Sequence, residues 1–136
     1  MAFLSPYRVL DLTDERGLLA GKIFADLGAD VIQVEPVRGS HARQMGPFRK
    51  DGPQNERSLY WEAYACNKRG ITCDLDSKEG QELFRRLCAS ADFLFESEMP
   101  GVMGRRGLSY EALQEINPRL IYVTITPFGR PVVPVV

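Results

Sequence analysis

The stretch "FADLGADVIQVEP", residues 24–36, decides how the chain folds. Its first half predicts a helix that ends at Gly28, because glycine readily takes the positive φ that follows a last helical turn. Its second half, residues 30–35, is rich in β-branched residues and predicts a strand that ends at Glu35. Residues 7–12, "YRVLDL", predict an earlier strand. The order strand, helix, strand favours a parallel pair joined by a right-handed crossover.

The helix between these two strands has start signals and an apolar pattern of its own. Thr13 is the expected N-cap, and Asp14 and Glu15 follow where the helix dipole favours negative charge. We expect its buried stripe to consist of apolar residues one helical turn apart and their neighbours, namely Leu18, Leu19, Ile23, Phe24 and Leu27.

Strands and helices continue to alternate after residue 57. We predict strands over 70–75, 92–97 and 119–125, and helices over 58–66, 77–90 and 110–116. Asp76 and Glu79 form a capping box for the helix over 77–90, and Ser109 caps the last helix. The 77–90 helix is expected to bury Leu83, Phe84, Leu87 and Cys88. The alternation predicts an α/β fold, a mostly parallel sheet with helices on both faces.

In a sheet of this kind, ligands bind outside the carboxyl ends of the strands. Those ends are predicted at residues 13–17, 35–38, 74–76 and 97–105. Any binding site is therefore expected to use these four segments. The segment 36–57, rich in Pro, Gly and charge, is expected to be a long surface loop in which His41 is exposed.

Composition excludes several classes of protein. The 136 residues carry a net charge of −1, so no basic surface indicates nucleic acid as a partner. No apolar run approaches the roughly 20 residues of a membrane span, and the start lacks a secretion signal, so we expect a cytoplasmic protein. Three cysteines, an odd number, do not suggest a disulfide framework, and a single histidine makes a metal site improbable.

A dinucleotide-binding module is a less favoured interpretation. The turn after the first strand reads "TDERGLLAG", in which Gly17 and Gly21 do not complete G-x-G-x-x-G. Asp14 and Glu15 would also repel a pyrophosphate at this turn. Glu35 is therefore expected to pair with a neighbouring cation or loop amide rather than with a ribose. Lys68, in "NKR", is expected to be structural.

Five segments in register carry a resemblance to a known family. They are "VLDLT", "FADLGADVIQVEP", "NKRGITCDLDSKEG", "ADFLFES" followed by "PGVMGRRGLSYEAL", and "INPRLIYVTITPFG". Together they resemble the N-terminal portion of the family III CoA-transferases, the group that contains formyl-CoA transferase, the carnitine CoA-transferase and α-methylacyl-CoA racemase. The resemblance runs from about residue 7 to Gly129.

The resemblance implies a Rossmann-like domain over residues 1–130 that binds coenzyme A and is incomplete, followed by an atypical tail over 131–136. In such transferases an aspartate carries the acyl group as a mixed anhydride while CoA passes between carboxylic acids. That aspartate is expected outside this chain, so we assign no catalytic residue, no metal ligand and no prosthetic group. The resemblance also implies an interlocked homodimer. A racemase-type member and a truncated, non-catalytic remnant are the alternatives.

Matching positions at the strand tips imply contacts to CoA. The eight residues are Arg16, Arg38, Cys73, Leu75, Asp76, Ser97, Met99 and Arg105. Arg105 is the best single match, at a phosphate-binding arginine. Arg38 substitutes for an arginine that the family often has at Pro36. Asp76 replaces a lysine, and Glu98 and Met99 replace an aromatic and a basic residue. Two lost cationic contacts are expected to weaken CoA binding by about tenfold to several-hundredfold.

Overall fold

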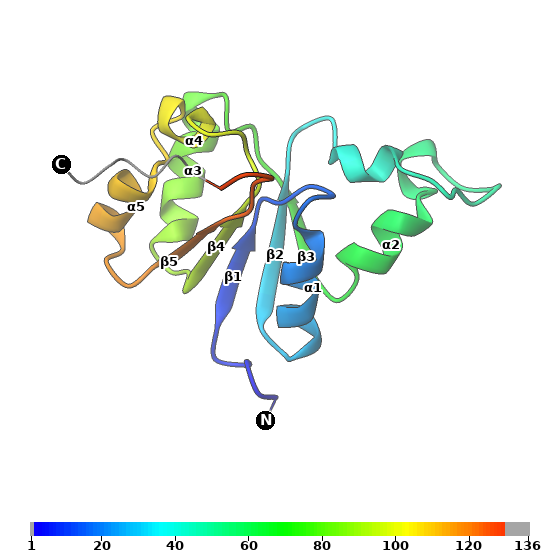
Figure 1. Cartoon of the computed structure of the whole chain (residues 1–136), viewed down its shortest axis with the longest axis horizontal. Coiled ribbons are helices and arrows are strands. Elements are labelled where there is room, and N and C mark those ends of the chain that lie inside the picture. Colours follow the sequence, from blue (N-terminus) through cyan, green and yellow to red (C-terminus); the bar gives the residue numbers. More distant parts are fainter. Residues whose placement is uncertain (1, 130–136) are drawn as a thin grey trace.

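The computed structural model of the chain describes residues 2–129 (Figure 1). Its centre is a five-stranded sheet in the order β3-β2-β1-β4-β5. The strands are β1 (Arg8–Asp11), β2 (Asp30–Glu35), β3 (Arg69–Thr72), β4 (Phe93–Glu96) and β5 (Ile121–Thr124). Every neighbouring pair is parallel. The predicted fold class is confirmed, and β2 spans residues 30–35 as predicted.

Helices lie on both faces of this sheet. They are α1 (Leu18–Asp26), α2 (Leu59–Ala65), α3 (Lys78–Cys88), α4 (Val102–Arg105) and α5 (Tyr110–Ile116), with short 3-10 turns η1 (His41–Gln44) and η2 (Gln54–Glu56). Figure 1 shows α3, α4 and α5 on one side of the sheet and α1 on the other, with α2 farther out beside α1. Among residues 2–129, no helix is long and apolar enough to cross a membrane.

Two apolar clusters hold the layers together. The larger lies between the sheet and α3 to α5, where Phe84, Leu94, Leu108 and Leu113 are completely buried. The smaller lies beneath α1 and includes Val9, Val31, Ala25 and Phe95. Phe24 of α1 packs edge-on against Phe93 and Phe95, with ring centroids 5.1 Å apart in each case. Both faces of the central strands are thus covered, which explains their nearly continuous apolar sequences.

The predicted buried stripe of α1 is partly wrong. Leu18 is buried and Phe24 packs against the smaller core, as predicted, but Leu19, Ile23 and Leu27 are 52%, 49% and 43% exposed. Beside Leu18, the face against the sheet carries Gly21 and Ala25. Helix α1 is apolar around most of its circumference, so a four-residue period could not distinguish its two apolar faces. The small side chains face the sheet because they let the helix approach it closely.

Two helix starts also differ from prediction. Thr13 does not cap α1, because its backbone N–H and hydroxyl both donate to Asp11 Oδ1; Gly17 holds the N-cap position. Ser77, rather than Asp76, caps α3. Ser109 caps α5 as predicted.

Helix α3 buries part of its predicted face. Phe84 and Cys88 are fully buried and Leu87 packs against them, whereas Leu83 is 44% exposed and that prediction is wrong. Burial raises the pKa of the Cys88 thiol to about 12, so this cysteine behaves as an apolar core residue.

Glu35 anchors the long segment that follows β2. Its carboxylate accepts hydrogen bonds from Arg43 Nε at 2.7 Å, Arg43 Nη2 at 2.8 Å and the Ser40 backbone N–H at 2.8 Å. The Arg43 guanidinium in turn lies 4.2 Å from the ring centroid of Trp61. The expected pairing of Glu35 with a cation and a loop amide is confirmed. Although burial opposes its ionisation, these partners hold the pKa of Glu35 below its usual value of 4.5.

A lowered pKa makes the contribution of Glu35 depend on pH. The group stabilises the fold fully above its unfolded pKa, and this stabilisation is lost as pH falls through the lower folded value. The free energy of unfolding of the native chain should therefore exceed that of Glu35→Gln most at neutral pH. The excess should shrink steadily once the pH drops below about 4.5. Urea titrations across this range measure it, and an excess that grows towards acid would contradict the assignment.

Candidate functional site

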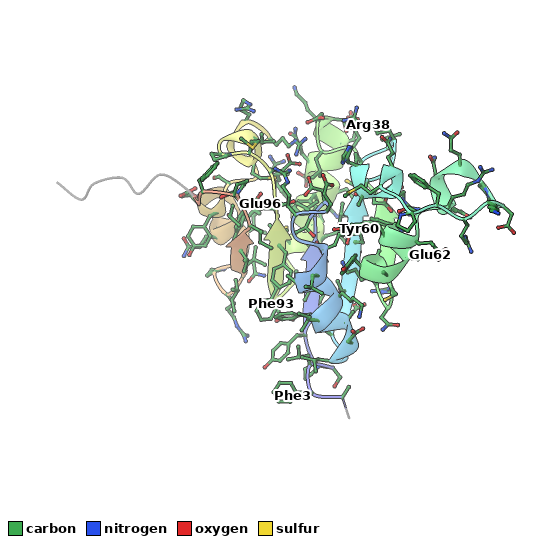
Figure 2. All side chains as sticks on the ribbon, turned by 45° about the vertical axis from the view of Figure 1, so that its right-hand side comes forward. Phe3, Arg38, Tyr60, Glu62, Phe93 and Glu96 are labelled. Atoms are coloured by element: carbon green, nitrogen blue, oxygen red, sulfur yellow. The ribbon has the colours of Figure 1, made fainter. Side chains whose placement is uncertain are left out.

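The strand order reverses direction next to β1, which lies between β2 and β4. Chain connections on the two sides of such a point diverge and leave a crevice at the carboxyl edge. A cleft of about 380 Å³ occurs there and is called the switch cleft. Its lining includes Thr13, Asp14, Arg38, His41, Gln44 and Ser97. Figure 2 shows Arg38 and Glu96 at this end of the sheet and Phe93 toward the other end.

The turn from β1 to α1 is fixed on one wall of the switch cleft. Ser97 Oγ donates to Asp14 Oδ1 at 2.9 Å and accepts from the Asp14 backbone N–H. Arg16 binds the same carboxylate through Nε and Nη2. Burial raises the pKa of Asp14, but the bonds from Arg16 and Ser97 outweigh it and leave the pKa lowered. A carboxylate thus stands where a dinucleotide fold would hold phosphate.

His41 was expected only to be exposed, and it proves to line the switch cleft as well. Its Nδ1 lies 3.0 Å from Glu15 Oε1, which fixes the imidazole at the mouth of the cleft. Nothing in the sequence indicated this pair, because the two residues meet only through the fold of the 36–57 segment. Arg38, a predicted site residue, lines the cleft beside it and is exposed.

A small pocket of about 80 Å³ adjoins the switch cleft at the ends of β2 and β3 and is called the tip pocket. Three predicted site residues line it, namely Cys73, Leu75 and Asp76. Cys73 and Leu75 are also buried members of the larger core, so one side of each packs inward. Burial and the nearby Asp74 raise the pKa of the Cys73 thiol. The side chain therefore stays uncharged and forms an apolar part of the pocket wall.

A third hollow, of about 300 Å³, lies between the start of α3 and α4 and is called the α4 cleft. Arg105 and Arg106 both line it. Arg106 donates to Asp76 Oδ1 at 2.8 Å and to Glu98 Oε1 at 3.1 Å, so two carboxylates neutralise it. Arg105 is exposed and has no ion pair within residues 2–129. The resemblance singled out Arg105, and the fold shows that the guanidinium already engaged by carboxylates is that of its neighbour Arg106.

The three hollows adjoin one another along the strand tips and are together called the crevice. The switch cleft and the tip pocket share Leu12, Val34, Pro36 and Glu98. The tip pocket and the α4 cleft share Asp76 and Arg106. Six of the eight predicted residues line this crevice: Arg38, Cys73, Leu75, Asp76, Ser97 and Arg105. The other two, Arg16 and Met99, lie next to it and touch each other, with Arg16 Nη1 3.9 Å from Met99 Sδ.

A buried ion pair supports the floor of the switch cleft. Lys68 Nζ contacts Asp11 Oδ2 at 2.9 Å, and both side chains are almost inaccessible, at 1% and 0%. The ammonium also donates to Gln33 Oε1 and to the Leu18 carbonyl, both at 3.0 Å. Gln33 donates to the carbonyl of Thr13, whose N–H and hydroxyl donate to Asp11. The network therefore fixes Thr13 through three of its polar groups.

Gly21 is required by this network. A Cβ at this position would lie 1.9 Å from Asp11 Oδ2 and 3.1 Å from Lys68 Nζ. The second glycine of "TDERGLLAG" therefore leaves room for a buried ion pair and does not approach a phosphate. The expected structural role of Lys68 is confirmed, although its partners could not be named from the sequence.

No group of three or more His, Cys, Asp or Glu side chains suited to a metal ion occurs among residues 2–129. In the central tip pocket the apolar side chains of Leu12, Val34, Cys73 and Leu75 are accompanied by four acidic residues and the paired Arg106. An exposed arginine lies towards each end of the crevice, Arg38 in the switch cleft and Arg105 in the α4 cleft. A crevice at the strand tips, next to the point where the strand order reverses, is the usual ligand-binding place of an α/β sheet.

Comparison with known proteins gives the family. The family model for "CoA-transferase family III" matches residues 4–132, and the chain belongs to this family. It is 46% identical over 126 residues to the succinyl-CoA:(R)-benzylsuccinate CoA-transferase subunit BbsE of Thauera aromatica, covering 93% of this chain and 31% of that protein. It is 42% identical over 132 residues to a succinate–glutarate CoA-transferase of Agrobacterium fabrum, covering 93% and 33%.

The solved structures agree with the sequence comparison. A CaiB/BaiF family protein from Brucella suis superposes with a TM-score of 0.84 at 40% identity, covering 90% of this chain and 33% of that one. The chain thus spans about a third of the length of the relatives that it matches. The resemblance stated from the five sequence segments is confirmed as a family membership.

Proposed function

We propose that this chain is the CoA-binding portion of an enzyme that transfers CoA between carboxylic acids. The relatives quoted above are named as transferases of CoA from one acid to another. In this proposal an aspartate outside these 136 residues attacks the thioester carbonyl and releases CoA as a thiolate. The thiolate attacks the aspartyl carbonyl of the resulting anhydride, which releases the first acid as a carboxylate and leaves an aspartyl-CoA thioester. The second carboxylate attacks this thioester, displaces the thiolate and forms a second anhydride. The thiolate then attacks the acyl carbonyl of that anhydride, which gives the new acyl-CoA and frees the aspartate. This is covalent catalysis by a carboxylate.

The crevice along the strand tips is the observation that supports this proposal. CoA carries about four negative charges near neutral pH, on a pyrophosphate and a 3′-phosphate, and arginine forks suit such groups. The adenosine end would occupy the tip pocket and the α4 cleft, where Leu75 supplies an apolar wall and Arg105 an exposed guanidinium. The pantetheine arm would then run into the switch cleft, past Ser97 and Arg38.

The ion pairs of Arg106 with Asp76 and Glu98 affect how strongly CoA can bind. Asp76 and Glu98 occupy its donors and, against the opposing effect of burial, keep its pKa raised. A phosphate must either compete with these carboxylates or rely on Arg105 alone. Both acids stand where the resemblance expects other residues, so the reduced CoA affinity expected from the sequence follows from this geometry as well.

Calorimetric titration of CoA into the full chain tests the proposal. We expect saturable binding, weakened about tenfold in Arg105→Gln by the loss of one charge-assisted contact. Arg119→Gln is the matched control, because Arg119 is an exposed arginine that precedes β5 at the opposite edge of the sheet. No heat at millimolar CoA, or equal weakening by both substitutions, would refute the proposal.

A further inference from the structure

A fourth hollow, of about 560 Å³, lies beyond the switch cleft, within the segment that follows β2. We call it the excursion cleft. It is lined by Arg43, Gln44, Phe48, Arg49, Gln54, Asn55 and Arg57. Gln44 also lines the switch cleft, so the two hollows adjoin. The excursion cleft is thus at the opposite end of the crevice from Arg105.

Three guanidinium groups and no carboxylate line this cleft. The three groups differ in how many of their N–H donors already have a hydrogen-bond acceptor. Each nitrogen of Arg43 already donates a hydrogen bond, Nε and Nη2 to Glu35, which neutralises its charge, and Nη1 to the Asn55 carbonyl. Arg43 therefore positions the cleft and is not available to a ligand.

Arg49 and Arg57 remain for a ligand. Arg49 Nη2 donates to the Glu56 carbonyl and lies 2.9 Å from Glu62 Oε1, but both side chains of that ion pair are about 45% exposed, so it is weak. Arg57 donates from Nε to the Gly52 carbonyl at 2.6 Å and has no ion pair within residues 2–129. Its two terminal nitrogens are therefore available for a bidentate contact.

The backbone holds these two arginines as neighbours. The Arg49 N–H donates to the Arg57 carbonyl at 2.8 Å, and Phe48 pairs with Ser58 in an antiparallel bridge. The Ser58 hydroxyl ties this pair to the Met45 carbonyl. The Phe48 ring, 51% exposed, adds an apolar surface beside the two cations. The cleft thus combines anion-binding groups held by the backbone with the apolar ring of Phe48.

We propose that the excursion cleft binds the free carboxylate of a dicarboxylic acid substrate, with Arg57 as the main contact and Arg49 as the second. The inference rests on the proposed function, which orients CoA with its adenosine end near Arg105 and its thioester in the switch cleft. The acyl chain then continues past Gln44 into the excursion cleft. The thioester of a monocarboxylic acid of the same length presents no carboxylate to the terminal nitrogens of Arg57, so the cleft selects acyl groups that carry a second carboxylate.

Glutaryl-CoA and pentanoyl-CoA, titrated separately into the full chain and followed by calorimetry and by two-dimensional NMR, test this site, because their acyl chains have the same length and only the first carries a free carboxylate. Glutaryl-CoA should bind saturably and shift backbone signals of residues 48–57, whereas pentanoyl-CoA should bind about tenfold more weakly. Arg57→Gln should weaken glutaryl-CoA binding about tenfold, the effect of one bidentate contact. Lys50→Gln, which removes an exposed cation of the same segment that does not line the cleft, should leave it unchanged.

Four outcomes contradict the inference: no shifts at residues 48–57 with glutaryl-CoA, equal affinity for pentanoyl-CoA, equal affinity in Arg57→Gln, or equal weakening by Lys50→Gln. CoA titrated into the same preparations separates this inference from the proposed function. CoA binding with equal affinities for the two thioesters refutes the dicarboxylate site alone. Absence of saturable binding by CoA and by both thioesters refutes the proposed function and, with it, this inference.

Discussion

Replacing Lys68 by methionine is expected to lower the free energy of unfolding by about 3–5 kcal/mol, because it leaves the carboxylate of Asp11 buried and uncompensated. Both side chains of the pair are within 1% of complete burial. Methionine keeps most of the volume of lysine, so the loss reports the charge and its three hydrogen bonds rather than a cavity. A domain of this size has a total stability of only about 5–15 kcal/mol, so much of it would be lost. Urea unfolding measures the change.

Two further variants test whether the buried, unpaired charge causes this loss of stability. The double substitution Asp11→Asn with Lys68→Met removes both charges while the asparagine oxygen can still accept from Thr13, so it should recover at least half of the loss. Lys22→Met breaks the exposed pair between Lys22 and Asp26 on α1 and should shift the urea midpoint very little. A Lys68→Met chain as stable as Lys22→Met, or a double variant less stable than Lys68→Met, would disprove the account of the network.

Gly80→Ala should destabilise the chain by about 1–3 kcal/mol, the usual cost of overpacking. Alanine at a helical position normally gains up to about 1 kcal/mol over glycine, so the sign of the effect is opposite to the helix propensity. A Cβ on Gly80 would lie 1.8 Å from the carbonyl oxygen of Asp74. That oxygen also accepts from the Ser77 hydroxyl at 2.9 Å. The turn therefore cannot shift without losing the bond that holds the start of α3 beside the tip pocket.

Gly104→Ala provides the control for this prediction. Gly104 lies in α4, and no heavy atom is within 4 Å of a Cβ built on it. Alanine there should be neutral or slightly stabilising. Thermal unfolding of both variants gives the comparison, and an unchanged or higher melting temperature for Gly80→Ala would contradict the packing described at this turn.

Much of the fold could be predicted because local chemistry dictates it. Residues 30–35 form a strand as expected because their β-branched residues are buried on both faces, and Gly28 follows α1 with a φ of 98°. The sequence could not show that Leu19 and Ile23 face outward, because the choice between two apolar faces of one helix depends on which side lets it approach the sheet. The predicted N-cap of α1 is wrong because Thr13 bonds to Asp11 instead of capping the helix. The observed N-cap of α3, Ser77, lies one residue after the predicted Asp76.

The candidate site could also be predicted only in part. The strand tips could be predicted to form a crevice because parallel strands bring their carboxyl ends to one edge. The partners within it could not be predicted. Lys68 and Asp11 are 57 positions apart, and only the pairing order of the strands brings them together. Arg105 and Arg106 are adjacent in sequence, yet the fold directs one to Asp76 and leaves the other exposed.

The central claim is that coenzyme A lies along the strand tips, with its adenosine end between β3 and α4. Two-dimensional NMR of the full chain titrated with CoA tests it most directly. The account predicts saturable shifts in the backbone signals of residues 73–76 and 97–106, with residues 28–30 and 118–120 at the opposite edge of the sheet unaffected. Saturable shifts confined to that opposite edge, or no shifts at millimolar CoA, would contradict it.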